Sequence, residues 1–242
     1  MPRGRLFVGT SGFAYKTWKP GFYPPEVKNA GMLRYYAERL PSVEINNTFY
    51  RAPTAKLLEG WLAETPPHFF FTLKAPQRIT HFARLKNAGA HVDYFLGTAK
   101  TLGDRLGTIL FQCPPNLRHD AELLAGFLAV LPDEGFRFAM EFRHASWKSD
   151  AVREALAAKN VAWCVAETEE DEGIVRTAKD FLYMRLRRGT YDEADVAARA
   201  VTLRPVLDEG VDAYVYFKHE DDPAGVRYAM RLRELCAPEN TS

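Results

Sequence analysis

Eight short apolar runs alternate along the chain with stretches of helical pattern, and this order limits the possible folds more than any other feature. The strand-like runs are Leu6–Gly9, Ser42–Phe49, Phe69–Ala75, Thr108–Cys113, Arg137–Arg143, Ala162–Glu167, Phe181–Arg187 and Ala213–His219. The helical stretches are Gly31–Leu40, Thr54–Glu64, Val92–Leu106, Ala121–Leu131, Asp150–Lys159, Glu193–Glu209 and Ala224–Cys236. Strands that alternate with helices are typical of βαβ units and therefore of a parallel sheet.

Eight such units predict a closed (β/α)₈ barrel of the TIM type rather than an open sheet. The length of 242 residues suits a barrel of one domain. We therefore predict a single α/β domain over residues 1–242, with a core from about residue 6 to residue 236. Asp120 and Asp192 are expected to cap the helices that follow them, and Pro132 to end the first of these. Only Thr168–Lys179 has the pattern of a polar loop where a helix would complete the alternation.

The composition supports a large core and excludes several classes of protein. Apolar residues make up 47% of the chain, and 32 basic residues against 31 acidic ones give a net charge of +1. A near-neutral chain is not expected to bind membranes or nucleic acids non-specifically over its whole surface. Since the N-terminus carries no signal peptide and no run could span a bilayer, we expect a cytoplasmic protein without membrane contacts. The three widely spaced cysteines form no zinc or redox motif, so buried reduced thiols are expected.

The phase of the strand-like runs predicts where the functional site lies. Side chains alternate between the two faces of a strand, so Ala139, Glu141 and Arg143 share one face while Phe138 and Met140 share the other. The same alternation in the other runs gives one apolar face and one face that turns polar at its C-terminal end. In a barrel the second face points inward, and barrel enzymes place their sites at this end. Eight side chains are therefore expected at one mouth: Glu44, Asn46, Lys74, Gln112, Glu141, Arg143, Arg185 and Lys218.

The charges of this set predict an anionic ligand. Glu44 and Glu141 are two carboxylates set against four cations, and buried charges without partners are very costly. A phosphate or carboxylate would balance the surplus, and Arg143 and Arg185 could bind it with paired hydrogen bonds. Structural ion pairs within the protein are the competing explanation for the same residues.

Other residues near the predicted mouth could contribute to binding or proton transfer. The segment Gly9–Tyr15 is rich in glycine, so its backbone could approach a ligand, or simply form a tight turn. Tyr15 and Tyr50 could stack on a base or a sugar ring, although such aromatics more often pack loops. His81 follows the third run and is a candidate for proton transfer.

No metal or other cofactor is predicted. The chain contains no HxH, HxxH or HExxH spacing. Glu44, Glu141, Glu167 and His144 could assemble a divalent-metal site only through the fold, and the surrounding cations oppose it.

Several motifs in order resemble those of the YecE-like family, also called domain of unknown function 72. They are Val8–Gly12 with Tyr15, Trp18 and Phe22–Pro24; Val43–Tyr50; Lys74 with Thr80-His81; Phe111–Pro115; Glu141–His144 with Trp147; and Tyr183–Leu186. The resemblance covers roughly Leu6 to Leu235. It implies a TIM-barrel fold and an activity that is not established. A fold-level likeness of that family to endonuclease and sugar-isomerase barrels suggests nucleic-acid or phosphate chemistry.

The sequence departs from the family pattern at two strand ends. Arg185-Leu186-Arg187-Arg188 stands where the family often has Arg-Leu-His-Gly, and Lys218-His219-Glu220-Asp221 stands where Asn-Asn-Asp is common. Both departures make the predicted mouth more basic. A role that needs the family's histidine or asparagines is therefore not expected in this chain.

Our leading hypothesis is an enzyme that acts on an anionic substrate, which bears a phosphate or a carboxylate and includes the nucleotide-like compounds, by acid–base chemistry. Glu44 and Glu141 are the candidate acid and base, with His81 as a secondary one, and the mouth cations would stabilise negative charge. Substrate contacts are expected from Asn46, Lys74, Gln112, Arg143, Arg185, Lys218, Tyr15 and Tyr50. The alternatives are a nucleic-acid binding or processing protein, which would use Tyr15, Trp18 and Tyr50 for stacking, and a non-catalytic metabolite-sensing barrel. The class of reaction (hydrolase, lyase or isomerase) and the oligomeric state stay open.

Overall fold

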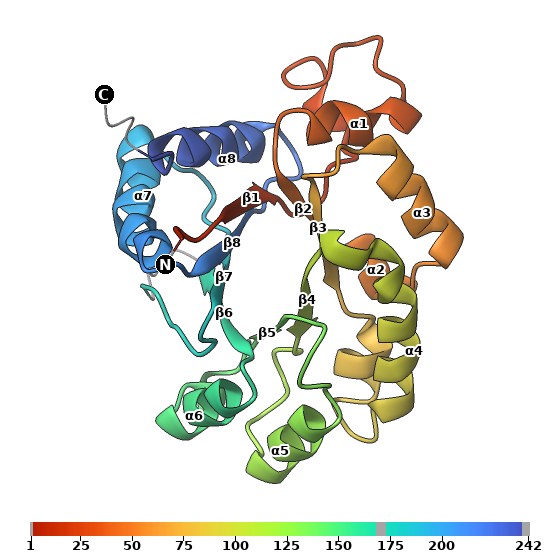
Figure 1. Cartoon of the computed structure of the whole chain (residues 1–242), viewed down its shortest axis with the longest axis vertical. Helices are drawn as coiled ribbons and strands as arrows, with labels where there is room; N and C mark the ends of the chain where they lie inside the picture. Colours follow the sequence, from red (N-terminus) through yellow and green to blue (C-terminus); the bar gives the residue numbers. More distant parts are fainter. Residues whose placement is uncertain (1, 168–172, 239–242) are drawn as a thin grey trace.

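A computed structural model of the chain describes residues 2–167 and 173–238. Its eight strands are all parallel to their neighbours, in the order β1-β8-β7-β6-β5-β4-β3-β2. They are β1 (Leu6–Thr10), β2 (Ser42–Ile45), β3 (Phe70–Lys74), β4 (Leu106–Gln112), β5 (Phe138–Glu141), β6 (Ala162–Glu167), β7 (Phe181–Leu186) and β8 (Asp212–Phe217). The circle closes between β1 and β2 through a parallel bridge from Ser11 to Glu44. The predicted TIM-type barrel is therefore confirmed (Figure 1).

Helices lie around the outside of the strands (Figure 1). They are α1 (Met32–Ala37), α2 (Asn47–Tyr50), α3 (Ala55–Glu64), α4 (Gly89–Ala99), α5 (Ala121–Ala129), α6 (Asp150–Ala158), α7 (Glu193–Asp208) and α8 (Ala224–Leu235). Short 3₁₀ or π turns occupy Lys16–Trp18, Asn29–Gly31, Arg78–Phe82, Lys100–Arg105 and Ala145–Trp147. No helix in the described part of the chain is long and apolar enough to cross a bilayer.

The expected helix signals are present in the structure. Asp120 accepts a hydrogen bond from the backbone N–H of Leu123 at the start of α5. Asp192 and Asp195 form a reciprocal capping box at the start of α7, which satisfies two backbone donors that a helix end leaves free. Between β6 and β7, residues 173–179 form no helix, as predicted, while residues 168–172 of that predicted loop lie outside the described residues.

Several predicted boundaries were wrong, and three of these elements bear on the site or its surroundings. The expected strand Ser42–Phe49 ends at Ile45, because the hydroxyl of Thr48 donates to Ile45 O (3.0 Å) and Lys74 O (2.6 Å) and turns the chain into α2. The expected helix Val92–Leu106 begins at Gly89 and ends at Ala99, since Gly103 has a φ of +54° within the following turn. The last strand ends at Phe217, before Lys218.

Two apolar layers make up the core. The larger one lies between the strands and the helices, and the smaller one fills the barrel with inward side chains that include Phe7, Leu110, Tyr183, Tyr214 and Tyr216. Such filling is usual for a barrel of eight strands, whose interior is a packed core and not a pore.

The barrel interior turns polar toward the C-terminal ends of the strands. The hydroxyl of Tyr216 lies 2.7 Å from Ser42 Oγ and 2.8 Å from Thr72 Oγ1, and all three residues are buried. Ser42 is two residues before Glu44, and Thr72 is two residues before Lys74, so both precede predicted mouth residues on the same strand faces. This hydroxyl layer therefore separates the aromatic filling from the charged groups at the mouth.

Candidate functional site

Arg185 lies at the centre of a buried ion network at the C-terminal ends of the strands. Its Nη2 donates to Glu44 Oε1 at 2.8 Å, and its Nη1 donates to Glu141 Oε2 at 2.6 Å. The three residues come from β7, β2 and β5, and all are essentially inaccessible to solvent. Two carboxylates from well-separated strands therefore share one guanidinium, which compensates much of the cost of burying them.

Glu44 has neutral hydrogen-bond donors as well. Ser11 Oγ donates to Glu44 Oε1 at 2.7 Å, and the phenol of Tyr183 donates to Glu44 Oε2 at 2.5 Å. Burial, followed by the nearby charge of Glu44, raises the pKa of Tyr183 well above its usual value, so this phenol stays protonated and acts as a donor. Both oxygens of Glu44 are thus occupied by contacts within the protein.

Glu141 is held as a carboxylate by its neighbours. Gln112 Nε2 donates to Oε2 at 2.8 Å, while Arg143 Nε and Arg187 Nη1 both lie 3.4 Å from Oε1. Burial alone would raise the pKa of Glu141, but Arg185, Gln112 and Arg187 outweigh it and lower that pKa to about 2. Glu141 therefore carries a full negative charge at neutral pH.

Lys74 is the cation whose protonation is most affected by this site. Its Nζ donates to Gln112 Oε1 at 2.8 Å and lies 4.0 Å from the centre of the Phe49 ring. Within residues 2–167 and 173–238, no carboxylate oxygen lies within 4.0 Å of it. Burial and the charge of Arg185 lower the pKa of Lys74 to about 8, although Glu44 and Glu141 oppose this shift.

His81 lies beside these cations. Its Nδ1 is 2.9 Å from the Thr80 hydroxyl, and its ring meets Phe49 edge-on at 4.8 Å. Burial, then the charges of Lys74 and Arg143, lower the pKa of His81. The imidazole is therefore neutral at physiological pH and can exchange protons with a neighbouring group.

The structure brings most of the predicted residues together. Six of them are linked by direct contacts into the network: Glu44, Lys74, Gln112, Glu141, Arg143 and Arg185. Lys218 and Tyr50 are not among them. Lys218 lies beyond the end of β8, with its Nζ 3.6 Å from Glu220 Oε1. Tyr50 ends the α2 turn and is 73% exposed.

Three network members were missed by sequence reasoning: Ser11, Tyr183 and Arg187. Arg187 follows Arg185 by two residues, so the same rule of alternation places both on one face of the β7 segment. Tyr183 precedes Arg185 by two residues and therefore lies on the same face. The contact of Ser11 depends on barrel closure, and no local pattern indicates it.

Glu167 and His144 lie away from the network. Glu167 faces the helices, where Tyr191 OH donates to it at 2.9 Å and Arg199 Nη2 at 3.0 Å. The Nδ1 of His144 lies 2.8 Å from the Ser146 hydroxyl. In the described part of the chain, no group of three or more His, Cys, Asp or Glu side chains is placed to hold a metal ion.

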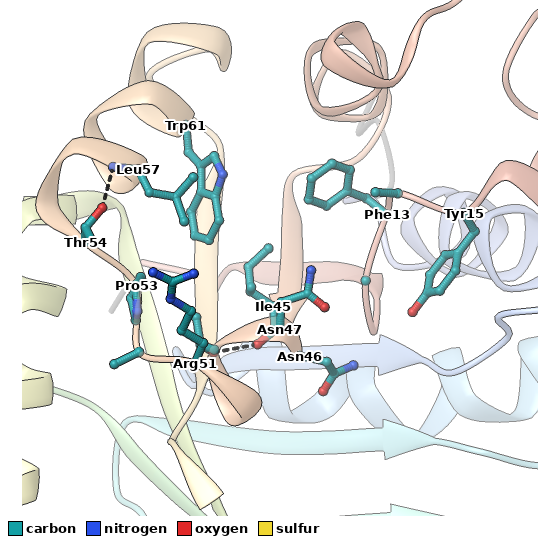
Figure 2. A pocket seen from close by; sticks show the side chains of 14 residues that line it. Phe13, Tyr15, Ile45, Asn46, Asn47, Arg51, Pro53, Thr54, Leu57 and Trp61 are labelled. Carbon is teal, nitrogen blue, oxygen red and sulfur yellow. Dashed lines mark hydrogen bonds between the residues drawn. The ribbon is translucent and has the colours of Figure 1, made fainter.

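Tyr15 and Asn46 line a cavity of about 570 Å³ beside the network. Figure 2 shows Tyr15 and Phe13, from the loop after β1, on one side of this space, and Trp61 and Leu57 of α3 on the other. Asn46 lies between the two sides. It follows Glu44 by two residues, so the cavity and the network meet at the same end of β2.

These features define an eight-stranded TIM-type barrel with a charged, buried cluster at the C-terminal ends of its strands. The chain belongs to the family described as "Protein of unknown function DUF72", which matches residues 7–242. It is 28% identical over 151 residues to the UPF0759 protein YunF of Bacillus subtilis, a match that covers 60% of this chain. The matched part is 52% of YunF, so the chain spans about half the length of this curated relative.

Solved structures of the same family share the fold. A DUF72 family protein from Thermotoga maritima superposes with a TM-score of 0.83 and 25% identity, over 96% of this chain and 98% of its own. A DUF72 family protein from Enterococcus faecalis gives a TM-score of 0.77 at 15% identity, over 98% of this chain and 100% of its own. At 15% identity, the similarity to the Enterococcus faecalis protein establishes only a common fold.

Proposed function

We propose that the chain is an enzyme that binds the phosphate or carboxylate group of a substrate over Lys74, Arg143 and Arg187 and catalyses a proton transfer beside it. The observation that carries this proposal is the charge of the network. Four cations (Lys74, Arg143, Arg185 and Arg187) face two carboxylates (Glu44 and Glu141), which leaves a surplus of two positive charges when Lys74 is protonated. Oxyanions are the natural counter-ions for such a cluster.

The partly exposed members of the cluster are the ones available to a ligand. The side chains of Arg143 and Arg187 are 34% and 20% exposed, whereas that of Arg185 is 3% exposed and has its two Nη atoms paired with Glu44 and Glu141. Arg185 Nε is buried and has no hydrogen-bond acceptor among the described residues. A buried donor without a partner is unfavourable, and an anionic oxygen at this point would satisfy it.

In this proposal the two glutamates position the cations, and proton exchange falls to Lys74 and His81. Glu141, with a pKa of about 2, is a poor proton donor and a weak base at neutral pH. Lys74, with a pKa of about 8, is close to the operating pH, where general acid–base catalysis is most effective. Arg143 and Arg187 would then stabilise negative charge that develops on the substrate.

Calorimetric titration of the protein with sulfate, phosphate and malonate tests the anion site. We expect Arg143→Gln and Arg187→Gln each to weaken binding by about tenfold, because each removes a charge-assisted contact. Arg153→Gln is the matched control, since Arg153 pairs with Asp150 on the outer helix α6. Anions that bind the wild type and the two mouth variants equally well, or do not bind at low salt, would overturn the proposal.

Two further measurements distinguish the alternative functions. Binding of single-stranded DNA or RNA that weakens steeply with salt, and that requires Arg143 and Arg187, would indicate a nucleic-acid binding mouth instead. A bound metabolite that co-purifies and is recovered chemically unchanged after prolonged incubation would indicate a sensing barrel.

A further inference from the structure

The cavity beside the ion network has the size and the walls of a small-molecule site. Its volume of about 570 Å³ lies within the range of ligand pockets, which are mostly apolar with a few polar groups aimed inward. Phe13 and Tyr15 form one wall, and Leu57 and Trp61 form the wall opposite (Figure 2). A flat group would contact aromatic rings on both sides.

The aromatic walls are held in place by their own contacts. The Tyr15 hydroxyl donates to Ser11 O at 2.8 Å, and its ring lies 4.9 Å from that of Trp18. Trp61 stacks on Phe71 of β3 at 5.6 Å and 21°. Rings that are already ordered lose little conformational entropy when a ligand packs against them, so the cavity is preorganised for stacking.

One buried polar atom of a residue that lines the cavity has no partner among the described residues. Asn46 Oδ1 is inaccessible to solvent and accepts no hydrogen bond from the described residues. Leaving a buried acceptor unsatisfied costs stability, and an N–H or O–H group of a ligand would remove that cost. Asn46 therefore selects for a ligand that brings a hydrogen-bond donor.

The cavity is joined to the network through Ser11. The backbone carbonyl of Ser11 accepts from Tyr15 in the cavity wall, while its hydroxyl donates to Glu44, which is paired with Arg185. The charge of Glu44 also contributes to the raised pKa of Tyr15, after burial and Glu220. The cavity and the ion network therefore meet at Ser11, at the same end of the barrel.

We propose that this cavity is the specificity pocket for an aromatic or heteroaromatic ring of the substrate, and that an N–H or O–H group on the ring donates to Asn46 Oδ1. The inference rests on the proposed function for the anionic end of the same molecule. It narrows the substrate class from anions in general to ring-bearing phosphates or carboxylates that carry a donor on the ring.

A series of phosphate compounds tests the pocket separately from the anion site. The probes are inorganic phosphate, phenyl phosphate, and the three positional isomers of hydroxyphenyl phosphate, measured by calorimetry. We expect phenyl phosphate to bind at least about tenfold more tightly than phosphate, because stacking of one ring adds that much affinity. At least one hydroxyl isomer is expected to bind more tightly still, because its O–H reaches Asn46.

Matched variants show which residue provides each part of the gain in affinity over inorganic phosphate. Asn46→Leu, which keeps the size and removes the acceptor, should abolish the advantage of the hydroxyl isomer and leave phenyl phosphate unchanged. Trp61→Leu should reduce phenyl phosphate to the affinity of inorganic phosphate. Tyr94→Leu is the control, because Tyr94 is an exposed aromatic that does not line this cavity.

The outcomes separate the two proposals. If phosphate binds and Arg143→Gln removes it, but phenyl phosphate binds no better than phosphate, the specificity pocket is overturned and the anion site stands. If phenyl phosphate binding is lost in Trp61→Leu and unaffected in Arg143→Gln, the pocket stands and the anion mouth is overturned. Absence of binding by every probe overturns both. Thermal melting of the variants checks folding, and Asn46→Leu provides the test if Trp61→Leu does not fold.

Discussion

Arg185 Nη1 and Glu141 Oε2 lie 2.6 Å apart in the interior of the barrel, and neither side chain reaches solvent. The same guanidinium bonds Glu44 on the far side of the barrel, so this one cation ties β7 to both β2 and β5. Removing one partner of a buried pair leaves the other charge uncompensated, which is far more costly than losing a pair on the surface. The network is therefore both a candidate site and part of the framework that holds it.

Glu141→Gln should destabilise the fold by about 3 kcal/mol, since it removes a buried charge that faces Arg185 and leaves a surplus cation behind. Urea unfolding followed by circular dichroism measures the change. Glu193→Gln is the control, because Glu193 pairs with Arg231 on the surface and its loss should move the midpoint very little. Equal shifts for the two variants would mean that the buried pair contributes nothing beyond a surface contact.

The stability of the wild type should fall in acid through the protonation of Glu141. The folded-state pKa is about 2, below the ordinary value of 4.5, so the unfolded chain binds the proton more readily. Its contribution is therefore complete above about pH 4.5 and is lost as the pH falls toward 2. Unfolding free energies measured between pH 2 and pH 7 should show this slope, and the slope should be smaller in Glu141→Gln. Parallel curves for the two proteins would contradict the assignment.

Sulfate binding should weaken as the pH rises through about 8, because Lys74 loses its proton there while sulfate keeps a constant charge. Lys74→Arg should remove this pH dependence, since a guanidinium remains protonated, and Lys74→Met should bind weakly at every pH. Calorimetry from pH 6 to pH 10 gives the three profiles. A wild-type affinity that is flat across this range would show that Lys74 does not meet the anion.

Whereas sulfate affinity should fall as the pH rises, the contribution of Lys74 to folding stability should increase. Its folded-state pKa of about 8 is below the ordinary 10.5, so between these values the unfolded chain binds more protons. The folded state should therefore gain stability, relative to Lys74→Met, as the pH rises from 8 to about 10. Denaturant unfolding of both proteins at these two pH values measures the change, and a wild type that loses stability relative to Lys74→Met over this range would contradict the lowered pKa.

Gly12→Ala should destabilise the protein by about 1–3 kcal/mol and weaken ring selectivity. Gly12 has a φ of +93°, and a Cβ there would lie 2.3 Å from the Tyr15 hydroxyl, so the cavity wall must move. Gly60→Ala in α3 is the matched control, because its Cβ would meet nothing within 4 Å and helix propensity favours alanine. We expect the control to stabilise the fold slightly. Unfolding in urea and the phenyl phosphate titration compare the two variants.

The alternation of side chains along strands accounts for what could be predicted of the site. Glu44, Lys74, Glu141 and Arg185 all lie at strand ends with the inward phase that the sequence indicates, and the structure joins them. The rule works because each side chain of a barrel strand points either into the barrel or outward, and the outward side chains are covered by helices.

The rule fails where the backbone leaves the strand. Lys218 was counted as if β8 continued, but the strand ends one residue earlier and the side chain turns to Glu220. Tyr50 is expected near the mouth because it directly follows the predicted strand Ser42–Phe49, whereas the α2 turn carries it to the surface. The cavity wall from α3 could not be predicted either, because the position of Trp61 depends on how that helix packs on β3.

The join between β1 and β2 differs from every other in the barrel, because it is a single bridge rather than a ladder. It includes the hydrogen bond from the Gly12 N–H to Glu44 O at 2.8 Å, and beside it the Ser11 hydroxyl donates to the carboxylate of the same glutamate. Glu44, which closes the barrel between β1 and β2, is thus also the residue that pairs with Arg185. A ligand that stabilises the ion pair between Arg185 and Glu44 should also stabilise the contact between β1 and β2. Hydrogen exchange of the Gly12 amide should therefore slow when a ligand occupies the mouth.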